Sequence, residues 1–493
     1  MPCPPDTSPK LRQHWQPMDY FSLYIAEDVY DKFEDSTNVA YHLRTGKLLS
    51  TSAAELKNFI DATFLMSCLG YPKMRLYWAQ GTRVPVIADM MSRDRFFTLR
   101  SNLKVVNDLD VPDDVKKSDR LWKIKPVINS IREACRKPPR PSMVSIDDQI
   151  IPFTGITTLK QYVPGKPHIT DLRNFVLASP SGLVLDYEIY LGKSTLCGGK
   201  NQELGIGANV ILHLTATLPP GTAVLFDRYF TTIPLLDELA KKNLRATGTI
   251  MKNRLPKGTK MEDDKTLSKR GRGSSCQVVN STSSTSLVKW MDNKPITLAS
   301  THIGEEPIGS CRRWSKKEKK YLDVPRPAIA DEYNRYMGGV DLCDLMLSLY
   351  STTQRTKKWT VRAMIFLLDL AAVNSWLQYK EDSVLLVRSK KNILGFLEFK
   401  MAFEHHLLAV DHGDTETCDA PPTKMLKMKV TPLPPVLQRH SYAKHMPELV
   451  SQSLSPRCRN PGCQKRSKVR CTTCDVFLCM TANRNCYKQF PTE

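Results

Sequence analysis

An apolar run that stops on a single carboxylate constrains the fold of this chain more than any other stretch. Residues 224–226 are Val-Leu-Phe, a pattern typical of a strand covered on both faces, and Asp227 follows directly. An amphipathic helical pattern begins at Pro234, and a second strand pattern covers residues 244–251. The stretch therefore predicts a strand–helix–strand unit. Asp227 either faces the ligand crevice at the carboxyl end of a parallel strand or only caps a turn.

The charge balance favours a polyanionic partner. Among 493 residues, 71 Lys and Arg outnumber 50 Asp and Glu, which gives a formal net charge of +21. Nucleic acid is the natural partner of such a surface, although a basic surface can also serve solubility alone. The best candidate for a membrane span, residues 363–376, is short and contains Asp369 and Asn374, so we expect a buried helix there. No secretory signal pattern is visible at the N-terminus.

The hydrophobic period changes along the chain. Residues 20–137 have helical patterns, which include a capping box at residues 52–55. A sheet is expected to begin near residue 142 and to include an antiparallel strand at residues 183–191. The polar stretch between about 252 and 326 predicts an insertion with three short strands, and helical patterns return at about residues 329–409. Several prolines then mark a linker before a cysteine-rich end.

Two further acidic motifs accompany Asp227. Asp147 lies in the apolar strand pattern of residues 144–153, where a carboxylate is costly unless it is exposed or paired. Asp341 and Asp344 are three residues apart, so on a helix they would share one face. Singly, each has a plain explanation, because Asp is a common helix cap and a common solvated residue. Together they supply the carboxylates that phosphodiester chemistry requires to hold two divalent ions roughly 4 Å apart.

Five spaced motifs resemble those of the piggyBac transposase family, which includes genome-resident, transposable-element-derived members. The resemblance extends from about Tyr20 to the C-terminal cysteines. The motifs are Ile146-Asp-Asp-Gln149 with Pro152-Phe-Thr-Gly155, Lys160-Gln-Tyr-Val-Pro-Gly-Lys-Pro167, Phe226-Asp-Arg-Tyr-Phe-Thr-Thr-Ile-Pro234, Ala246-Thr-Gly-Thr249, and Gly338-Gly-Val-Asp341 with Asp344.

The resemblance implies an α/β fold with a ribonuclease-H-like, retroviral-integrase-like catalytic core. A β-rich insertion would interrupt this core, and helical DNA-binding segments and a small C-terminal zinc-binding domain would flank it. The expected segments are a disordered lead-in (1–17), a helical DNA-binding or dimerisation segment (18–141), the core (142–350) with its insertion (about 253–326), a helical segment completing the DNA-binding domain (351–410), a linker (411–456) and the zinc-binding domain (457–490).

The resemblance also implies an activity. Asp147, Asp227 and Asp341 match the catalytic triad of the family, Asp344 matches its additional acid, and Asp148 is the neighbour that is not a ligand. These aspartates would hold two Mg²⁺ ions, for which oxygen ligands are suitable. The implied reaction is cut-and-paste DNA transposition through hairpin ends, with strand transfer at TTAA. A homodimer is implied because two transposon ends must be held at once. We expect neither a membrane nor a small-molecule substrate.

Three alternatives stay open. A domesticated, catalytically silent, sequence-specific DNA-binding protein would keep the fold and the zinc domain. A nuclease with the same core could act without transposition, and a zinc-dependent ubiquitin ligase fits the cysteine pattern poorly. The sequence also departs from the family pattern, because Arg228 replaces a usual Asn and Asp171 falls near a usual Gly. Arg228 could pair with Asp227 and compete with a metal, or it could hold a phosphate.

Six cysteines in the last part of the chain predict structural zinc rather than disulfides. They are Cys458, Cys463, Cys471, Cys474, Cys479 and Cys486. Two cross-braced ions need eight ligands, so the segment holds one full and one incomplete site, or it recruits His440 or His445 from upstream. The pair Cys471 and Cys474 has the spacing of a zinc knuckle. By resemblance this domain recognises transposon-end DNA, and the alternative is a finger that binds chromatin or protein.

Two basic clusters contain an indole, a combination that can neutralise phosphates and stack on an exposed base. Either cluster could also be only a solvated surface, or an import signal of the nuclear protein that we expect. The candidate DNA-binding residues are Arg312, Arg313, Lys316, Lys317, Arg355, Lys357, Lys358 and Trp359.

Overall fold

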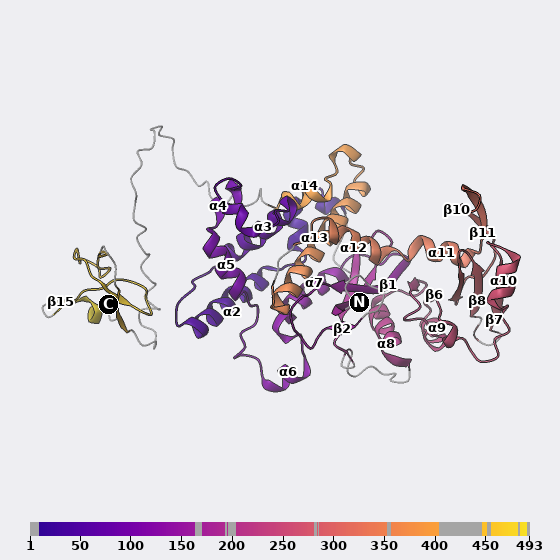
Figure 1. Ribbon diagram of the computed structural model, residues 1–493, viewed down its shortest axis with the longest axis horizontal. Coiled ribbons are helices and arrows are strands. Elements are labelled where there is room, and N and C mark those ends of the chain that lie inside the picture. Colours follow the sequence, from indigo (N-terminus) through magenta and orange to yellow (C-terminus); the bar gives the residue numbers. More distant parts are fainter. Residues whose placement is uncertain are drawn as a thin grey trace. The chain divides into compact units, whose positions relative to one another are not determined.

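The computed structural model forms two compact units along the chain (Figure 1). One unit consists of Met1–Glu27, Asp61–Arg83 and Ile124–Glu404, and the other consists of Asp28–Ile60, Val84–Lys123 and His405–Glu493. The residues that the structure describes are 9–162, 170–192, 195, 204–280, 283, 285–352, 356–403, 446–450, 455–481 and 484–490.

A nine-stranded mixed sheet forms the centre of the first unit. The strand order is β2-β3-β1-β5-β6-β9-β8-β7, and β4 also pairs with β3. Strands β1, β5 and β6 are parallel to one another, whereas the other pairings are antiparallel. The strands are β1 (Met143–Ile151), β2 (Gln161–Tyr162), β3 (Thr170–Ala178), β4 (Val184–Ile189), β5 (Ala223–Phe226), β6 (Arg245–Thr249), β7 (Ser275–Val279), β8 (Ser286–Met291) and β9 (Pro295–Ser300).

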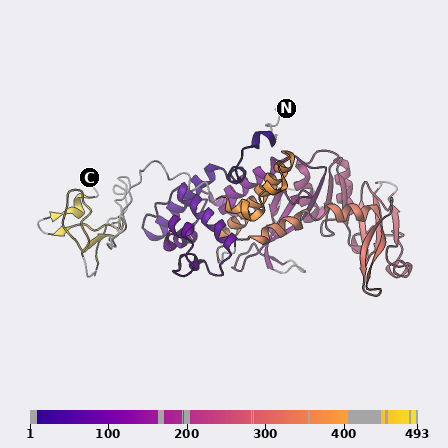
Figure 2. The ribbon, with the colours of Figure 1, turned by 90° about the horizontal axis from the view of Figure 1, so that it is seen from above.

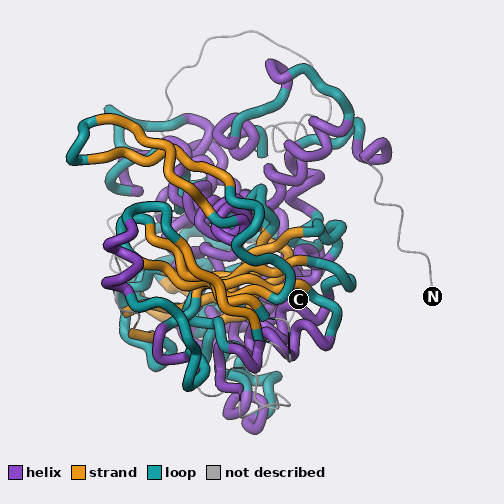
Figure 3. Tube along the Cα trace, turned by 90° about the vertical axis from the view of Figure 1, so that its right-hand side faces the viewer, coloured by secondary structure: helices purple, strands orange, loops and turns teal. Residues whose placement is uncertain are grey.

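The strand–helix–strand prediction around Asp227 is confirmed. All four residues of β5 are buried, helix α9 (Ile233–Lys241) follows, and β6 lies parallel to β5. The three short strands expected within the insertion are also present as β7, β8 and β9. They are not a separate sheet, because β9 hydrogen-bonds to β6 and thereby extends the central sheet. Figure 2 shows residues 275–326, pink to orange, beyond the central strands, and Figure 3 shows strands lying side by side.

Helices of the first unit contribute a largely buried second layer. The other α-helices of this unit are α1 (Pro17–Ser22), α7 (Lys125–Arg136), α8 (Gly205–Leu214), α10 (Asp264–Arg270), α11 (Ala328–Tyr336), α12 (Gly339–Leu349), α13 (Trp359–Leu385) and α14 (Phe396–Met401). Short 3-10 helices are η1 (Pro9–Arg12), η2 (Met74–Trp78), η3 (Trp122–Ile124), η6 (Thr215–Thr217), η7 (Lys252–Arg254) and η8 (Lys390–Asn392).

Helix α13 is long and apolar enough to cross a membrane by length and hydropathy, but 89% of its most apolar window is buried inside the protein. Its two polar residues noted in the sequence are satisfied there. Asp369 forms an ion pair with Lys400 at 2.9 Å, and the Asn374 carboxamide bonds to both the N–H and the carbonyl of Val184. The helix is therefore a core helix of this unit, as expected from its polar residues.

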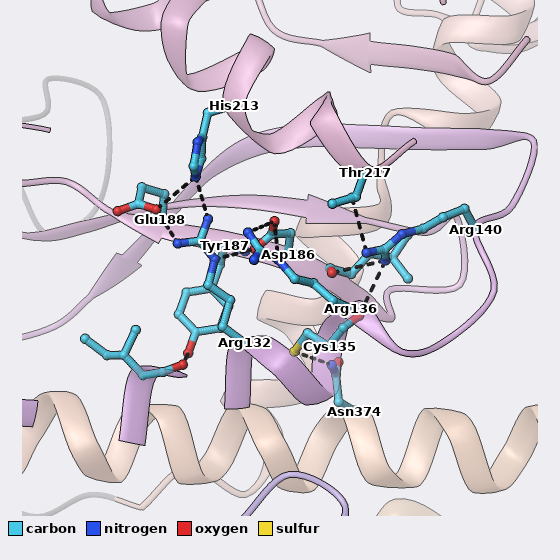
Figure 4. A network of polar contacts seen from close by, with 12 residues as sticks. Arg132, Cys135, Arg136, Arg140, Asp186, Tyr187, Glu188, His213, Thr217 and Asn374 are labelled. Atoms are coloured by element: carbon cyan, nitrogen blue, oxygen red, sulfur yellow. Dashed lines mark hydrogen bonds and ion pairs between the residues drawn. The ribbon is translucent and has the colours of Figure 1, made fainter. Parts of the chain in front are cut away.

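A buried ion network attaches α7 and α8 to β4 (Figure 4). The fully buried Asp186 accepts hydrogen bonds from Arg132 at 2.6 Å and from Arg136 at 2.8 Å. Arg132 also donates to Glu188 at 2.5 Å and contacts His213. Burial alone would raise the pKa of Glu188, but His213 and Arg132 outweigh it and lower that pKa. Charged pairing thus compensates the desolvation of Asp186.

The second unit contains helices and the cysteine-rich segment. Within the helical pattern of residues 20–137, α4 ends at Met90 and a separate helix starts at Arg93, because Ser92 caps it with its side chain. Helix α3 begins after Ser52, whose hydroxyl accepts the Glu55 N–H as the capping box predicts. The elements are α2 (Glu27–Thr45), the part of α3 (Ala53–Leu69) up to Ile60, α4 (Pro85–Met90), α5 (Arg93–Asn102), α6 (Asp113–Ser118), β12 (Pro447–Leu449), β13 (Val469–Cys471), β14 (Met480–Thr481), β15 (Arg484–Asn485) and α17 (Cys486–Gln489).

Candidate active site

The parallel ladder between β1 and β5 aligns two of the predicted acids. Ile146 is the register partner of Phe226, so Asp147 and Asp227, the next residues on the two strands, lie at the same level of neighbouring strands. Both side chains are partly exposed. Asp227 terminates β5 at its carboxyl end, which is the position that its sequence context predicts.

Helix α12 crosses the same face of β1 and carries the other two acids. Gly339 lies so close to β1 that an added Cβ would be 2.7 Å from the Ser145 hydroxyl and 2.3 Å from the Ser179 carbonyl. Further along the strand, Gln149 donates a hydrogen bond of 2.6 Å to the Asp344 carboxylate. Ser145, Asp147 and Gln149 alternate onto one face of β1. Asp341, in the first turn of α12, therefore lies along the same stretch as Asp147.

Tyr333 on α11 links three of the carboxylates. Burial chiefly raises the pKa of Tyr333, and the nearby charges of Asp227, Asp147 and Asp341 raise it further. Tyr333 therefore lies near this group of acids, whose positions are set by the β1–β5 register and by the contacts of α12 with β1. The structure thus brings together acids from β1, β5 and α12 that are far apart in the sequence.

The carboxylates are spaced more widely than the ligands of a single ion. In the part of the chain that the structure describes, one group of at least three ligating atoms within 4.8 Å of one another is found, and it consists of cysteines. Two ions roughly 4 Å apart need no such compact group, because each acid can contact a different ion or bridge both. The carboxylate oxygens at this edge of the sheet are therefore suitable ligands for a pair of hard divalent cations.

Neighbouring residues fix the position of Asp227. The Thr249 hydroxyl, at the end of β6, donates to the Asp227 carboxylate at 3.1 Å. Arg254 donates to the carbonyls of residues 228, 229 and 231 at 2.8–3.0 Å and so ties down the loop after the acid. Gly248 allows close packing here, since an added Cβ would be 2.8 Å from the Phe226 carbonyl. Thr249 lies in one of the quoted motifs, whereas Tyr333 and Arg254 carry no signal that sequence patterns alone would reveal.

Asp148 faces the opposite side of β1. Its carboxylate is buried 3.3 Å from the buried Arg173 guanidinium, which stacks at 4.7 Å from the Phe175 ring and 4.2 Å from the Tyr229 ring. The backbone N–H of Asp148 donates to the Asp147 carboxylate at 2.7 Å. Strand alternation thus separates the candidate ligand from its acidic neighbour.

The two departures from the family pattern have different environments. Arg228 is exposed, and among the described residues the ion pairs within 4.0 Å do not include one between Arg228 and Asp227. The side chain of Arg228 is therefore available to a phosphate rather than held by the acid. Asp171 is buried on β3 and accepts the Phe153 N–H at 2.9 Å, so it serves local structure.

Four of the six C-terminal cysteines form one cluster. The sulfur atoms of Cys458, Cys463, Cys479 and Cys486 all lie within 4.8 Å of one another, a donor set that suits tetrahedral zinc. A backbone hydrogen bond from Lys465 and bonds from the other thiols lower the pKa of Cys463 to about 7. A thiol with this pKa is readily a thiolate, the form that binds zinc.

The pair with knuckle spacing is not part of this cluster. Cys471 and Cys474 lie next to each other, with the Cys474 N–H directed at the Cys471 sulfur at 3.5 Å. Burial chiefly raises the pKa of the Tyr487 hydroxyl, and the nearby Cys471 and Cys474 raise it further. The predicted upstream ligands His440 and His445 lie outside the described residues. The described ligands thus make one four-cysteine group and one separate pair.

The predicted DNA-binding residues lie on two elements. Arg312 and Arg313 belong to strand β10 (Gly309–Ser315), which pairs with β11 (Lys320–Arg326), and Lys316 and Lys317 lie at the exposed turn between them. In the second cluster, Lys357 and Lys358 are exposed just before α13, which begins at the partly buried Trp359, and Arg355 lies outside the described residues.

Comparison with known proteins identifies the class. A family model described as Transposase IS4 matches residues 16–376, which is most of the chain, and the chain belongs to this transposase family. Its relatives are of the piggyBac type. The chain is 29% identical to human PiggyBac transposable element-derived protein 3 over 97% of its own length and 76% of that protein. It is 27% identical to human PiggyBac transposable element-derived protein 2 over 74% of its own length and 61% of that protein.

Two further matches extend this result. The human Chimeric ERCC6-PGBD3 protein is 29% identical over 97% of this chain, which covers 43% of that longer protein. A solved structure of piggyBac transposase in a synaptic complex with hairpin DNA aligns with a TM-score of 0.67 at 18% identity, covering 95% of this chain and 96% of the other. The expected ribonuclease-H-like fold is therefore confirmed.

Proposed function

We propose that the protein is a metal-dependent DNA transposase of the piggyBac type. Two observations carry this proposal: the β1–β5 register aligns Asp147 with Asp227, and α12, which contains Asp341 and Asp344, packs closely on the same face of β1. Asp344 joins them through Gln149, which lies two residues after Asp147 on β1. A structural role for these acids would not require that several carboxylates gather at one edge of a sheet, where like charges repel.

The residues at this edge have distinct tasks. The four aspartates would hold two Mg²⁺ ions, which would lower the cost of the charge that develops on the attacking and leaving oxygens. Thr249 orients Asp227, and Gln149 orients Asp344. The exposed guanidinium of Arg228 is placed to bind a phosphate of the substrate strand.

The reaction is a series of phosphodiester exchanges. Water hydrolyses one strand at the transposon end and releases a 3′ hydroxyl. This hydroxyl attacks the opposite strand, and the bond that breaks leaves a hairpin on the transposon end. The hairpin is opened by a second hydrolysis, and the 3′ ends then attack target DNA at TTAA. The matching solved structure is a synaptic complex with hairpin DNA, which supports a hairpin intermediate for this chain as well.

Partners and location follow from the same proposal. A homodimer would hold two transposon ends, as the synaptic complex of the structural relative suggests. The four-cysteine cluster would bind one structural zinc ion, and its segment would recognise transposon-end DNA. The protein would act in the nucleus, with its basic clusters serving import as well as DNA binding. The domain boundaries expected from the sequence are part of this proposal.

A second candidate function is a catalytically silent DNA-binding protein. The names of two relatives describe them as transposable element-derived, which is the origin of domesticated proteins. Such a protein would keep the fold, the zinc segment and the basic surface without strand transfer. The intact set of four aspartates favours the enzyme over this alternative.

The experiment that separates the two functions is a cleavage assay. The full chain is mixed with labelled DNA that carries the nearest matching terminal repeats, with Mg²⁺ or with a chelator. We expect Mg²⁺-dependent nicking and hairpin products that Asp147→Asn and Asp341→Asn abolish, while Asp114→Asn, an exposed acid on α6, has no effect. Specific binding without any product would favour the silent protein. Nicking that survives both core substitutions would show that the active site is assigned wrongly.

A further inference from the structure

The ribbon formed by β10 and β11 has two different faces. Residues alternate between the faces of a strand. Cys311 and Val324, which are register partners, are buried in a cluster with Trp290 of β8 and Ile329 of α11. The opposite face carries residues that are exposed to solvent. One face of the ribbon thus packs on the protein, and the other is free to meet a partner.

An aromatic pair lies on the exposed face. Trp314 and Tyr321 are register partners whose ring centroids are 5.3 Å apart in an edge-to-face arrangement. Their exposed fractions are 49% and 59%, which is unusual for side chains of this size. The Arg312 guanidinium lies 5.1 Å from the Tyr321 ring centroid. The rings keep each other in place but leave much of their surface in water.

Hydrogen bonds from neighbouring elements fix the backbone of the ribbon. Arg272 donates to the Trp314 carbonyl at 3.2 Å, and Asp292 accepts from both Arg272 and Arg313. The Trp290 indole donates to the Pro325 carbonyl at 3.0 Å. The backbone that carries the aromatic pair is therefore fixed at both strands. Binding of a partner would not have to pay the conformational entropy of ordering this backbone.

The charge around the aromatic pair is strongly positive. The ribbon and its turn, residues 309–326, contain the cations Arg312, Arg313, Lys316, Lys317, Lys319, Lys320 and Arg326 and the acids Glu318 and Asp323. Arg313, Lys320 and Arg326 have acidic partners in Asp292, Glu318 and Asp331. Arg312 and the lysines of the turn are exposed. The surface therefore suits a flexible polyanion that also offers flat apolar groups.

We propose that the exposed face of this ribbon binds unpaired bases of DNA. A base would stack on Trp314 and Tyr321, and Arg312 with the lysines of the turn would hold the flanking phosphates, which is how single strands are bound without sequence preference. This deepens the proposed function, because strand transfer through a hairpin needs unpaired nucleotides at the transposon end. A duplex could also receive a two-stranded ribbon in its major groove, but its stacked bases would leave the exposed rings without a partner.

The test compares single-stranded and duplex DNA. The full chain without divalent ions is titrated against labelled oligo(dT) and against a blunt duplex of equal length, with fluorescence anisotropy as the readout. Trp314→Ala and Tyr321→Ala should each weaken binding of the single strand about tenfold and change duplex binding by less than about twofold. Trp314→Phe, which keeps an aromatic ring, should retain most of the wild-type affinity for the single strand. Val279→Ala, at an exposed apolar residue on β7, is the control and should change neither.

The charged residues give a second readout. A double variant, Lys316→Gln with Lys317→Gln, should weaken both DNA forms and lower the salt dependence of binding for both. Aromatic variants that weaken duplex and single strand equally, or that leave single-strand binding unchanged, would overturn the proposal. A loss on duplex alone would overturn it in favour of groove binding.

This binding assay is independent of catalysis. It needs no Mg²⁺ and no cognate sequence, so a protein that never cleaves DNA can still pass it. If cleavage is observed but the aromatic variants bind normally, the ribbon proposal fails while the proposed function stands.

Discussion

The proposed carboxylate site and the four-cysteine cluster differ in how the fold brings their ligand atoms together. The carboxylates come from two strands and a helix, between Asp147 and Asp344, and strand register aligns two of them. The cysteines all come from one short segment, between Cys458 and Cys486, and they form most of its buried cluster together with Val476, Leu478 and Phe490. The first site is a small part of a large core, whereas three of the four clustered cysteines belong to the small buried core of the C-terminal segment.

This difference assigns the metal a different task at each place. The sheet can form without ions, so ions at its edge would serve chemistry and not folding. The cysteine segment has only a small buried core, and a segment of this size usually needs a metal to fold. Removing ligands should therefore cost activity at one site and structure at the other.

The largest expected effect is at the carboxylate site. Asp227→Asn should lower the rate of DNA cleavage by about a thousandfold, or about 4 kcal/mol, because a metal ligand is lost. The free energy of unfolding without divalent ions should not fall, since the amide can still accept the Thr249 hydrogen bond and one of several like charges is removed. Cleavage kinetics and denaturant unfolding measure the two quantities. A marked loss of folding stability in Asp227→Asn would contradict the view that this site serves activity and not folding.

The cysteine site should respond in the opposite way. Cys458→Ser should release the bound zinc and unfold the segment around residues 455–490, because structural zinc contributes on the order of 10 kcal/mol to such segments. The melting transition of the large core should stay the same. Elemental analysis and limited proteolysis of the C-terminal segment give the readouts.

Two other cysteines sharpen this test. Cys276→Ser, in β7, should retain all zinc and serves as the control. Cys471→Ser should leave one zinc ion in place, because Cys471 is not in the four-cysteine cluster. A complete loss of zinc in Cys471→Ser would contradict the grouping of ligands described above.

A smaller effect is expected from the backbone that supports the carboxylates. Gly248→Ala would place a Cβ 2.3 Å from the Thr231 hydroxyl and 2.8 Å from the Phe226 carbonyl. Overpacking of this kind costs about 1–3 kcal/mol of the free energy of unfolding, and the displaced Phe226 should also slow cleavage. Gly81→Ala, whose Cβ would meet no atom within 4 Å, is the matched control. Equal free energies of unfolding for the two variants would show that the residues around Gly248 can move to accommodate a methyl group.

The smallest effect concerns pH and the network on β4. The pKa of Glu188 is lowered, so its carboxylate stabilises the fold above its unfolded pKa of about 4.3, and this contribution is lost as the pH falls through the folded pKa. Wild type should therefore exceed Glu188→Gln in stability at pH 7, and the gap should narrow below about pH 4.3. Denaturant unfolding at several pH values measures it. A stability difference between wild type and Glu188→Gln that increases as the pH falls would contradict this prediction.

Local patterns predicted much of the fold. The run at residues 224–226, the helix that follows and the parallel strand after it were predictable because each pattern is continuous in the sequence. The pairing of β9 with β6 was not, because strand register is set by contacts between residues far apart. The sequence therefore indicated an insertion without showing that it extends the sheet.

The same limit applies to the candidate site. The aspartates stand out because an acid within or directly after an apolar strand is costly. The sequence did not single out Tyr333 and Arg254, because a tyrosine on an amphipathic helix and an arginine in a polar loop are common. Only the fold shows that they lie beside Asp227. Spacing also pointed to Cys471 and Cys474 as ligands of a zinc knuckle, whereas the four clustered thiols are brought together by the fold of the segment.

The pairing of β9 with β6 has a mechanical consequence. The strands from β5, which ends on Asp227, to β8, on which the ribbon packs, are joined by one uninterrupted ladder of backbone hydrogen bonds. Neighbouring strands are spaced about 4.8 Å apart, so the ladder sets the distance between Asp227 and β8. A nucleotide held on the ribbon would remain at a set number of strand widths from the acids, and the sheet would thus measure out which phosphate reaches them.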